Sequence, residues 1–170
     1  MGGSYKSLQY AFRVTHNTIS CILLETCRAI VSAFGDEELQ VPQTPEAWRQ
    51  VARGFEERWS FPHVIGAIDS KHIRLRNPPL GGTRYYNYKK LFSTILLAIV
   101  NSSYKFLYVD VGAIGSESDG GVFAQIRLCE MLAKQEANLP QPDALPDATN
   151  GAPVDYFLLG DDAFPCGTIS

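Results

Sequence analysis

The sequence has few cysteines, no long apolar run and no excess of positive charge. Its four cysteines include no Cys-x-x-C pair, which argues against a secreted disulfide scaffold and favours reduced thiols in the nucleus or cytosol. The longest apolar stretch, residues 95–100, is far shorter than the roughly 20 residues that span a bilayer. Because no basic segment followed by an apolar run opens the chain, no secretory signal is expected either. No membrane partner is predicted.

The overall charge limits how the protein could bind nucleic acid. The formal net charge is −3 at pH 7, which argues against binding through bulk positive charge but leaves room for a local basic surface. Apolar residues make up 45% and charged residues 19%, a mixture typical of a folded globular protein. A chain of 170 residues suits one domain, or a catalytic core preceded by a small helical appendage.

The first 60 residues are predicted to be helical. Apolar residues at spacings of three and four over residues 7–33 indicate two helices with a break at Val14-Thr15, where Thr15 caps the second. This arrangement suits a helix-turn-helix remnant that contacts DNA, and it suits a plain helical hairpin equally well. Thr44-Pro45-Glu46 then has the features of a helix start, and Trp48 begins an apolar stripe expected to face a core.

From residue 61 the sequence pattern predicts strands together with a helix, as in an α/β fold. Strands are predicted near residues 64–69, 91–100 and 104–112, with a hairpin between the second and third. In the third strand, Leu107, Val109 and Val111 are predicted to share one face. A helix is expected after Gly115, then an exposed loop over residues 138–153 and a last short strand over residues 156–159.

Three aspartates are predicted to lie where an element begins or ends. Asp69 follows the first strand, Asp119 opens the helix, and Asp161 follows the fourth strand. Carboxylates on neighbouring strand ends can bind hard cations such as Mg²⁺ or Mn²⁺, and such ions promote phosphodiester cleavage. The alternatives are that Asp119 only caps its helix and that Asp162, beside Asp161, is only a turn residue. Asp69 has no comparable structural explanation, because a charge gains nothing from the core it abuts.

A local basic cluster follows Asp69 and is interleaved with tyrosines, a pattern that suits a phosphate backbone and splayed bases. The alternative is a solvated loop and strand edge. His72 is expected to orient or pack rather than to bind a hard ion. The predicted DNA-binding residues are Arg74, Arg84, Lys89 and Lys90.

Five motifs together resemble the catalytic domain of PIF/Harbinger transposases and the nucleases derived from them. The resemblance covers roughly residues 45–166, and the motifs occur in the family's order. They are Ile65-Gly66-Ala67-Ile68-Asp69 with Lys71-His72-Ile73, Tyr85-Tyr86-Asn87-Tyr88-Lys89, Phe106-Leu107-Tyr108-Val109-Asp110-Val111-Gly112, Ser118-Asp119-Gly120-Gly121-Val122-Phe123, and Leu159-Gly160-Asp161-Asp162-Ala163-Phe164-Pro165.

The resemblance implies a metal-dependent DNA endonuclease of DDE type. It implies a ribonuclease-H-like mixed sheet with flanking helices over residues 61–170, preceded by the helical region 1–60. Asp69 and Asp161 match the first two catalytic aspartates, and Asp119 matches a further acidic position of the divalent-metal site, so Asp69, Asp119 and Asp161 are the expected ligands of Mg²⁺ or Mn²⁺. A nuclear location, DNA as substrate and a Myb-like partner protein are implied by the same resemblance.

The family's third catalytic residue, a glutamate on a later helix, has no counterpart before Ser170. The C-terminal part of the fold is therefore expected to be missing, with apolar side chains of the strands left facing water. A second hypothesis follows, in which the chain is a domesticated or truncated DNA-binding or interaction protein that retains the fold without catalysis. Under the enzyme hypothesis, Asp69 and Asp161 should lie on adjacent parallel strands, close enough to share a cation.

Overall fold

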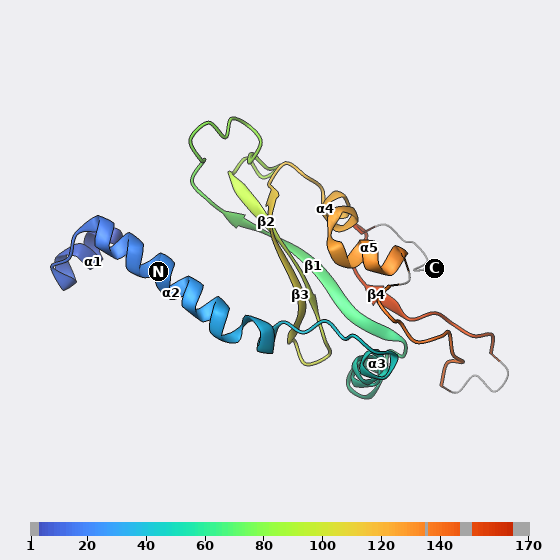
Figure 1. Cartoon of the computed structure of the whole chain (residues 1–170). Helices are drawn as coiled ribbons and strands as arrows, with labels where there is room; N and C mark the ends of the chain where they lie inside the picture. The colour runs from blue at the N-terminus through green and yellow to red at the C-terminus, as the bar shows by residue number, and fades with distance from the viewer. Residues whose placement is uncertain (1–3, 135, 147–150, 165–170) are drawn as a thin grey trace. The chain divides into compact units, whose positions relative to one another are not determined.

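The computed structural model describes residues 4–134, 136–146 and 151–164 (Figure 1). The chain forms two compact units, residues 1–38 and residues 39–170. The units divide earlier than the boundary at residue 60 expected from the sequence, because the third helix packs with the sheet of the second unit. Each unit is described by itself.

The first unit is a pair of helices, α1 (Tyr5–Phe12) and α2 (His16–Glu38). Arg13 adopts a left-handed conformation, with φ of 53°, and ends α1. The predicted break and cap are confirmed, because the Thr15 hydroxyl accepts a hydrogen bond of 3.2 Å from the amide of Thr18. Helix α2 runs to Glu38, five residues beyond the expected end, so most of this unit is one long helix.

Helix α2 is long and apolar enough to cross a membrane by length and composition alone. One such helix near the N-terminus is weak evidence for a membrane span, since core helices and signal sequences have the same properties. The absence of a membrane partner therefore stays a prediction.

The second unit is built on a four-stranded mixed sheet. Its strands are β1 (Val64–Arg74), β2 (Ser93–Val100), β3 (Phe106–Ile114) and β4 (Phe157–Leu159), in the order β3-β2-β1-β4. β1 pairs antiparallel with β2, β2 antiparallel with β3, and β1 parallel with β4. The predicted α/β fold class is confirmed, and this order and these directions are those of part of a ribonuclease-H-like fold.

Strand β1 is longer than the sequence predicted. It continues through Asp69 to Arg74, because its pairing with β2 is uninterrupted from Ala67 opposite Val100 to Arg74 opposite Ser93. Asp69 therefore lies in the middle of a strand rather than at its end. In this half of the strand Asp69 and Lys71 are exposed on one face, while Ser70 and His72 are half-buried on the other.

Strand β3 does not alternate as predicted. The register between β2 and β3 slips near Leu107, so that Phe106 pairs with Val100 but Tyr108 pairs with Ile99. Because of this bulge, Leu107 joins the buried core while Val111, expected on the same face, is 56% exposed.

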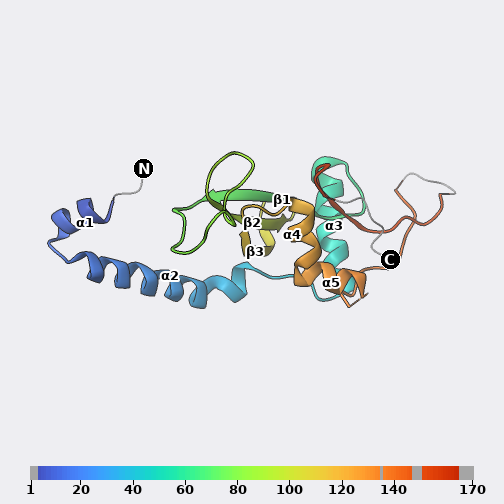
Figure 2. The ribbon, with the colours of Figure 1, turned by 90° about the horizontal axis from the view of Figure 1, so that it is seen from above.

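The predicted helix after Gly115 is two short helices, α4 (Asp119–Gln125) and α5 (Arg127–Ala133), which lie next to each other (Figure 2). Ile126 between them is extended, with ψ of 145°, and its side chain is 2% exposed. The break lets apolar residues of both helices reach the core that they share with one face of β1 and β2. That core includes Ile68, Ile95, Leu97, Ile99, Val122, Ile126, Leu128 and Leu132.

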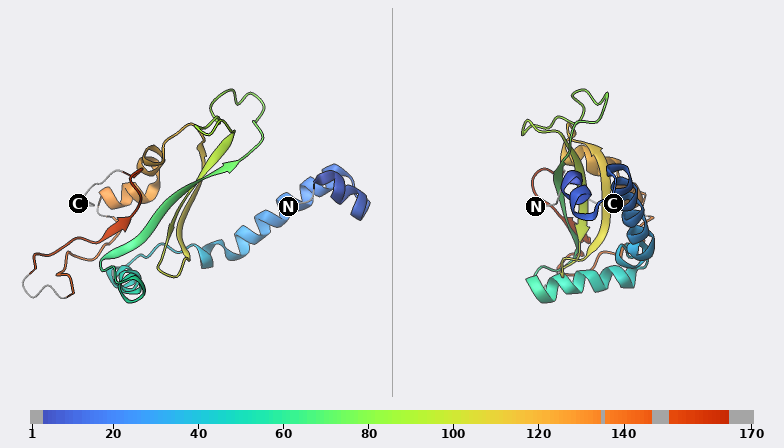
Figure 3. Two further views of the ribbon diagram at one scale, coloured as in Figure 1. Left: turned by 180° about the vertical axis from the view of Figure 1, so that it is seen from behind. Right: turned by 90° about the vertical axis from the view of Figure 1, so that its left-hand side faces the viewer.

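Helix α3 (Pro45–Trp59) packs on the start of β1, where Trp48, Ala52 and Ile65 form a second buried cluster. The Trp48 indole also donates a hydrogen bond of 2.8 Å to the carbonyl of Ala137. Figure 3 shows α3 at one end of the sheet and the loop of residues 75–92 extending from the opposite end. The sequence correctly predicted the aromatic stripe of α3 as a core face.

Three cysteines lie in the described part of the chain, and all three are free thiols. Cys21 and Cys27 are exposed, whereas Cys129 is half-buried and its thiol pKa is raised, first by burial and then by the charge of Glu130. Cys166 lies outside the described residues. The predicted loop over residues 138–153 is irregular where it is described, and a single bridge joins Asp143 to Val154.

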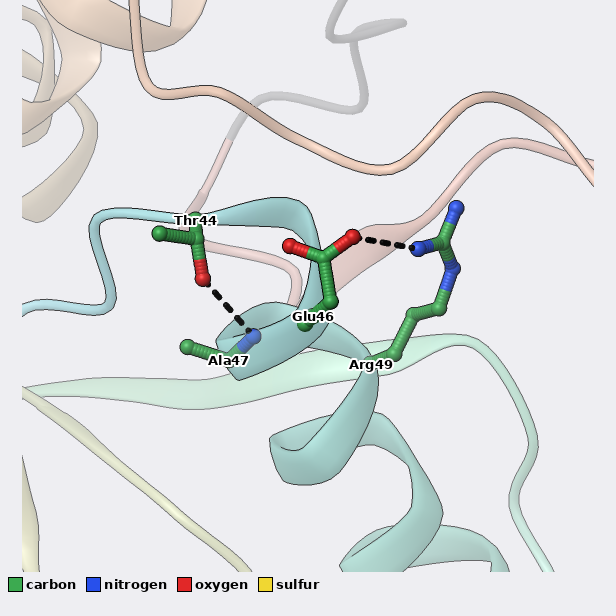
Figure 4. Close-up of polar contacts among 4 residues, drawn as sticks. All are labelled: Thr44, Glu46, Ala47 and Arg49. Carbon is green, nitrogen blue, oxygen red and sulfur yellow. Dashed lines mark hydrogen bonds and ion pairs between the residues drawn. The ribbon is translucent and has the colours of Figure 1, made fainter.

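The start of α3 provides a test of its local stability. The Thr44 hydroxyl accepts a hydrogen bond of 3.2 Å from the amide of Ala47, and Glu46 pairs with Arg49 at 3.4 Å (Figure 4). We expect Thr44→Ala to lower the free energy of unfolding by about 1 kcal/mol, because a helix amide loses its partner. Glu46→Gln should change it by less than about 0.5 kcal/mol, because that ion pair is exposed. Urea denaturation followed by circular dichroism measures both, and equal losses would contradict this account.

Candidate metal site and cationic cavity

Asp69 lies on β1, and Asp161 lies two residues after the end of the neighbouring strand β4. The parallel pairing of β1 with β4 brings Ala67 opposite Leu159, and each aspartate lies two residues further along its own segment. In parallel strands, residues in register point to the same face. The predicted parallel pairing of the two strands is present, but β4 ends at Leu159 and Asp161 lies two residues beyond it. That Asp69 and Asp161 share a cation stays a prediction.

The residue before Asp161 fixes how closely the two segments approach. A Cβ atom on Gly160 would lie 2.9 Å from Cγ2 of Ile68 and 3.0 Å from Cδ2 of Phe164. The segment after β4 therefore lies directly against β1 one residue before Asp69. Phe164 in turn packs edge-on against Phe123 of α4, with ring centroids 5.9 Å apart.

Both carboxylates are exposed and each is tied to its own backbone. Oδ1 of Asp69 accepts a hydrogen bond of 2.7 Å from the amide of Ser70, and Oδ1 of Asp161 accepts one of 3.1 Å from the amide of Ala163. Within the described residues, the second oxygen of each carboxylate makes no hydrogen bond. These contacts orient the two groups and leave oxygen atoms available to a ligand.

Asp119 lies on the other face of β1. It is the first residue of α4, after the capping residue Ser118, and its carboxylate hydrogen-bonds to the hydroxyl of Ser70. Because side chains alternate along a strand, Ser70 and Asp69 point to opposite faces. The structure therefore does not bring Asp119 to the same face as Asp69, and its role as a metal ligand stays a prediction. Among the described residues, no three His, Cys, Asp or Glu side chains form a group that could hold an ion.

A polar cavity of about 260 Å³, here called the β1 cavity, opens on the face of β1 that carries Ser70. It contains two of the four predicted DNA-binding residues, Arg74 and Lys89. Arg84 instead lines a separate hollow with Asp110 and Glu117, and Lys90 is exposed on a turn. The β1 cavity is lined by Ser70, Lys71, His72, Arg74, Asn87, Tyr88, Lys89, Leu91, Ser93 and Asp119.

His72 lines this cavity and hydrogen-bonds to a buried serine. Its Nδ1 lies 2.9 Å from the hydroxyl of Ser93, which also accepts a hydrogen bond of 2.9 Å from the side-chain amide of Asn87. Ser93 is fully buried and Asn87 is 4% exposed. Sequence reasoning missed both residues as parts of a site, because neither belongs to the charged set and only the pairing of β1 with β2 brings them to His72.

A second hollow, of about 330 Å³, lies on the opposite face of β1. Asp69 and Lys71 border it, together with apolar residues of β2 and β3. These include Leu96, Ala98, Val100 and Phe106, of which Phe106 is 49% exposed. The candidate metal ligand Asp69 thus has a cation on its own strand face and an open apolar surface beside it.

Comparison with known protein families shows which family the chain belongs to. Residues 68–169, well over half of the chain, match the family described as DDE superfamily endonuclease. The chain belongs to this family. No curated protein and no solved structure matches it. The matched region of this DDE endonuclease domain contains Asp69, Asp119 and Asp161, and the family implies DNA as the substrate.

DDE endonucleases use divalent metal ions, which take oxygen ligands from carboxylates, water and phosphates. Mg²⁺ is commonly bound through one or two protein carboxylates, with water and substrate phosphates completing the coordination shell. Asp69 and Asp161 supply two exposed carboxylates of that kind on parallel segments. Their carboxylate oxygens are donors of the type that a hard divalent cation takes.

Gly160 offers a test of the packing that holds Asp161 in position. We expect Gly160→Ala to lower the free energy of unfolding by roughly 1–3 kcal/mol, because the added methyl group overlaps Ile68 and Phe164. Gly35→Ala is the matched control, since a Cβ atom there meets only Val31 at an ordinary 3.7 Å inside a helix. It should be neutral or stabilising. Thermal melting measures both, and an unchanged Gly160→Ala variant would show that the segment is loosely held.

Proposed function

We propose that this chain is a divalent-metal-dependent DNA endonuclease domain of transposase origin, of the PIF/Harbinger type. Its reaction is hydrolysis of a phosphodiester bond, in which water adds to the phosphorus and the leaving oxygen departs as a hydroxyl. The observation that carries the proposal is the parallel pairing of Ala67 with Leu159, since Asp69 and Asp161 each follow one of these paired residues by two positions. Their positions in the five sequence motifs support the same assignment.

In this proposal Asp69 and Asp161 hold the metal ion. A bound Mg²⁺ or Mn²⁺ supplies stabilisation of negative charge on the phosphate oxygens and lowers the pKa of a bound water. Lys71 shares the strand face of Asp69 and borders the same hollow, so its ammonium group can contact the DNA backbone. The hydrogen bonds from the Ser70 and Ala163 amides keep each carboxylate in one orientation.

A second candidate function is DNA binding without cleavage, by a domesticated relative that retains the fold. One observation favours it: the Asp119 carboxylate is bonded to Ser70 on the face opposite Asp69. With two carboxylates rather than three on one side, an ion would depend more on the substrate for its ligands. A nuclear location and a Myb-like partner belong to both forms of the proposal and rest on the sequence resemblance.

The test is metal-dependent nicking of supercoiled plasmid DNA by the purified chain. We expect slow nicking with Mn²⁺ or Mg²⁺, none with EDTA, and a loss of roughly 100-fold or more in Asp69→Asn and in Asp161→Asn. A ligand should matter at least as much as the outer-shell groups whose loss costs about 10–100-fold. Asp155→Asn is the matched control, since it removes the same charge from an exposed residue two positions before β4. Asp162→Asn should retain activity if Asp161 is the ligand.

Two outcomes would contradict the enzyme proposal. Nicking that persists in Asp69→Asn would indicate a contaminating nuclease or a different site. DNA binding without any metal-dependent nicking, unchanged in Asp69→Asn and Asp161→Asn, would favour the non-catalytic function.

A further inference from the structure

We propose that the β1 cavity binds one unpaired nucleotide of the DNA, with its phosphate near Arg74 and Lys89 and its base against Tyr88. This inference rests on the proposed function only in taking DNA as the ligand. It assigns a task to residues outside the candidate metal site, and it predicts a preference for single-stranded or frayed DNA over a closed duplex.

The charge of the cavity points to an anionic ligand. The chain carries a net charge of −3, yet this cavity is lined by the three cations Lys71, Arg74 and Lys89 and by one carboxylate, Asp119. Within the described residues, none of these three cations forms an ion pair with a carboxylate. With three cations against one carboxylate, the lining has an excess of positive charge that suits a phosphate.

The floor of the cavity is rigid and polar. Ser93 is held from several sides, by Asn87, by His72 and by its own amide, which donates a hydrogen bond of 2.8 Å to the Tyr85 carbonyl. A Cβ atom on Gly115 would overlap the hydroxyl and carbonyl oxygens of Ser93, so the backbone also packs closely there. Because Nδ1 of His72 is engaged by Ser93, Nε2 is the ring nitrogen left to a ligand.

Asn87 connects this floor to the loop that carries the aromatic and cationic side chains. The side-chain oxygen of Asn87 accepts a hydrogen bond of 3.0 Å from the backbone amide of Leu91, and the backbone amide of Asn87 donates one of 2.9 Å to the Leu91 carbonyl. Of the three residues between Asn87 and Leu91, Tyr88 and Lys89 line the cavity. The loop geometry is set before a ligand arrives, which reduces the entropy lost on binding.

Tyr88 is the feature that favours a nucleotide over free phosphate. Its side chain is 77% exposed although it lines the cavity, and its ring meets His72 edge-on at 5.6 Å. Lys89 lies 5.2 Å from the same ring. An exposed aromatic ring beside cations is how proteins stack bases of single-stranded nucleic acid, while a base inside a duplex has no free face to offer.

The size of the cavity limits the ligand to part of a polymer. Its volume of about 260 Å³ lies below the roughly 300–1,000 Å³ of ordinary small-molecule sites, which suits one base or one sugar-phosphate rather than a free cofactor. Its rim begins at Ser70, one residue from Asp69. Because Asp69 points to the opposite face of β1, the cavity is separate from the candidate metal ligands.

The experiment measures binding without cleavage. Fluorescence anisotropy of a fluorescein-labelled 12-nucleotide single strand, and of the same sequence as a blunt duplex, is recorded with the full chain in EDTA at several salt concentrations. The variants are Tyr88→Ala, Tyr88→Phe, Arg74→Gln and Lys89→Gln. The controls are Lys105→Gln, which removes an exposed cation from the turn between β2 and β3, and Tyr104→Ala, which removes a 65% exposed aromatic ring beside α3. Thermal melting confirms that each variant is folded.

We expect Tyr88→Ala to weaken single-strand binding by roughly fivefold or more, as for loss of a base stacked on an aromatic ring, while Tyr88→Phe and the controls stay within about twofold. Duplex binding should change little in Tyr88→Ala. Arg74→Gln and Lys89→Gln should each reduce the slope of log K against log salt for the single strand by about 0.7, because one phosphate contact is lost. Tyr88→Ala should leave that slope unchanged.

Three results would overturn the inference. Single-strand binding that is unaffected in all four variants would show that the cavity does not contact DNA. Equal losses for single strand and duplex in Tyr88→Ala would exclude an unpaired nucleotide, and equal losses in Lys105→Gln and Arg74→Gln would indicate diffuse charge. Repeating the series in Asp69→Asn separates this inference from the enzyme proposal, because the Tyr88 effect should persist there even if no DNA is ever cut.

Discussion

The parallel pairing of β1 with β4 is the constraint on which the candidate active site depends. Strand β4 has only three residues, so its few backbone hydrogen bonds cannot position the following segment by themselves. Leu158 adds apolar contacts to both buried clusters, and Gly160 permits the chain to lie directly on Ile68. A non-local contact of this kind brings together Asp69 and Asp161, which are far apart in the sequence. If the pairing slipped by one residue, Asp161 would point to the opposite face.

Strand β1 divides its residues between two different surfaces. Asp69 and Lys71 border an open hollow with apolar walls, while Ser70, His72 and Arg74 border a polar cavity with a fixed floor. This division follows from the twofold period of a strand and needs no loop movement. Lys71 borders both surfaces, whereas Asp69 borders the open hollow and Asp119 borders the polar cavity.

Features that depend on neighbouring residues could be predicted from the sequence, whereas features that depend on contacts between distant parts of the chain could not. The caps at Thr15 and Thr44 were predicted correctly because a hydroxyl and an amide three residues apart interact locally. The extension of β1 past Asp69 was missed because β2 supplies its hydrogen bonds from across the chain. The bulge at Leu107 was missed for the same reason: alternation in one strand does not reveal a slip relative to its partner. The break at Ile126 was missed because its cause is burial of that side chain in a core formed by distant residues.

The hydrogen bond between Asp119 and Ser70 places a negative charge in the lining of the β1 cavity. Helix α4 is anchored by Val122 in the core, so its first residue cannot shift far along the sheet, and only the side chain of Asp119 is free to turn. In its present orientation the carboxylate makes one end of the β1 cavity negative while Arg74 and Lys89 keep the rest positive. A phosphate entering this cavity would be repelled from the Asp119 end and attracted toward the two cations. The hydrogen bond to the Ser70 hydroxyl holds Asp119 on this face, so the cavity lining combines one carboxylate with three cations.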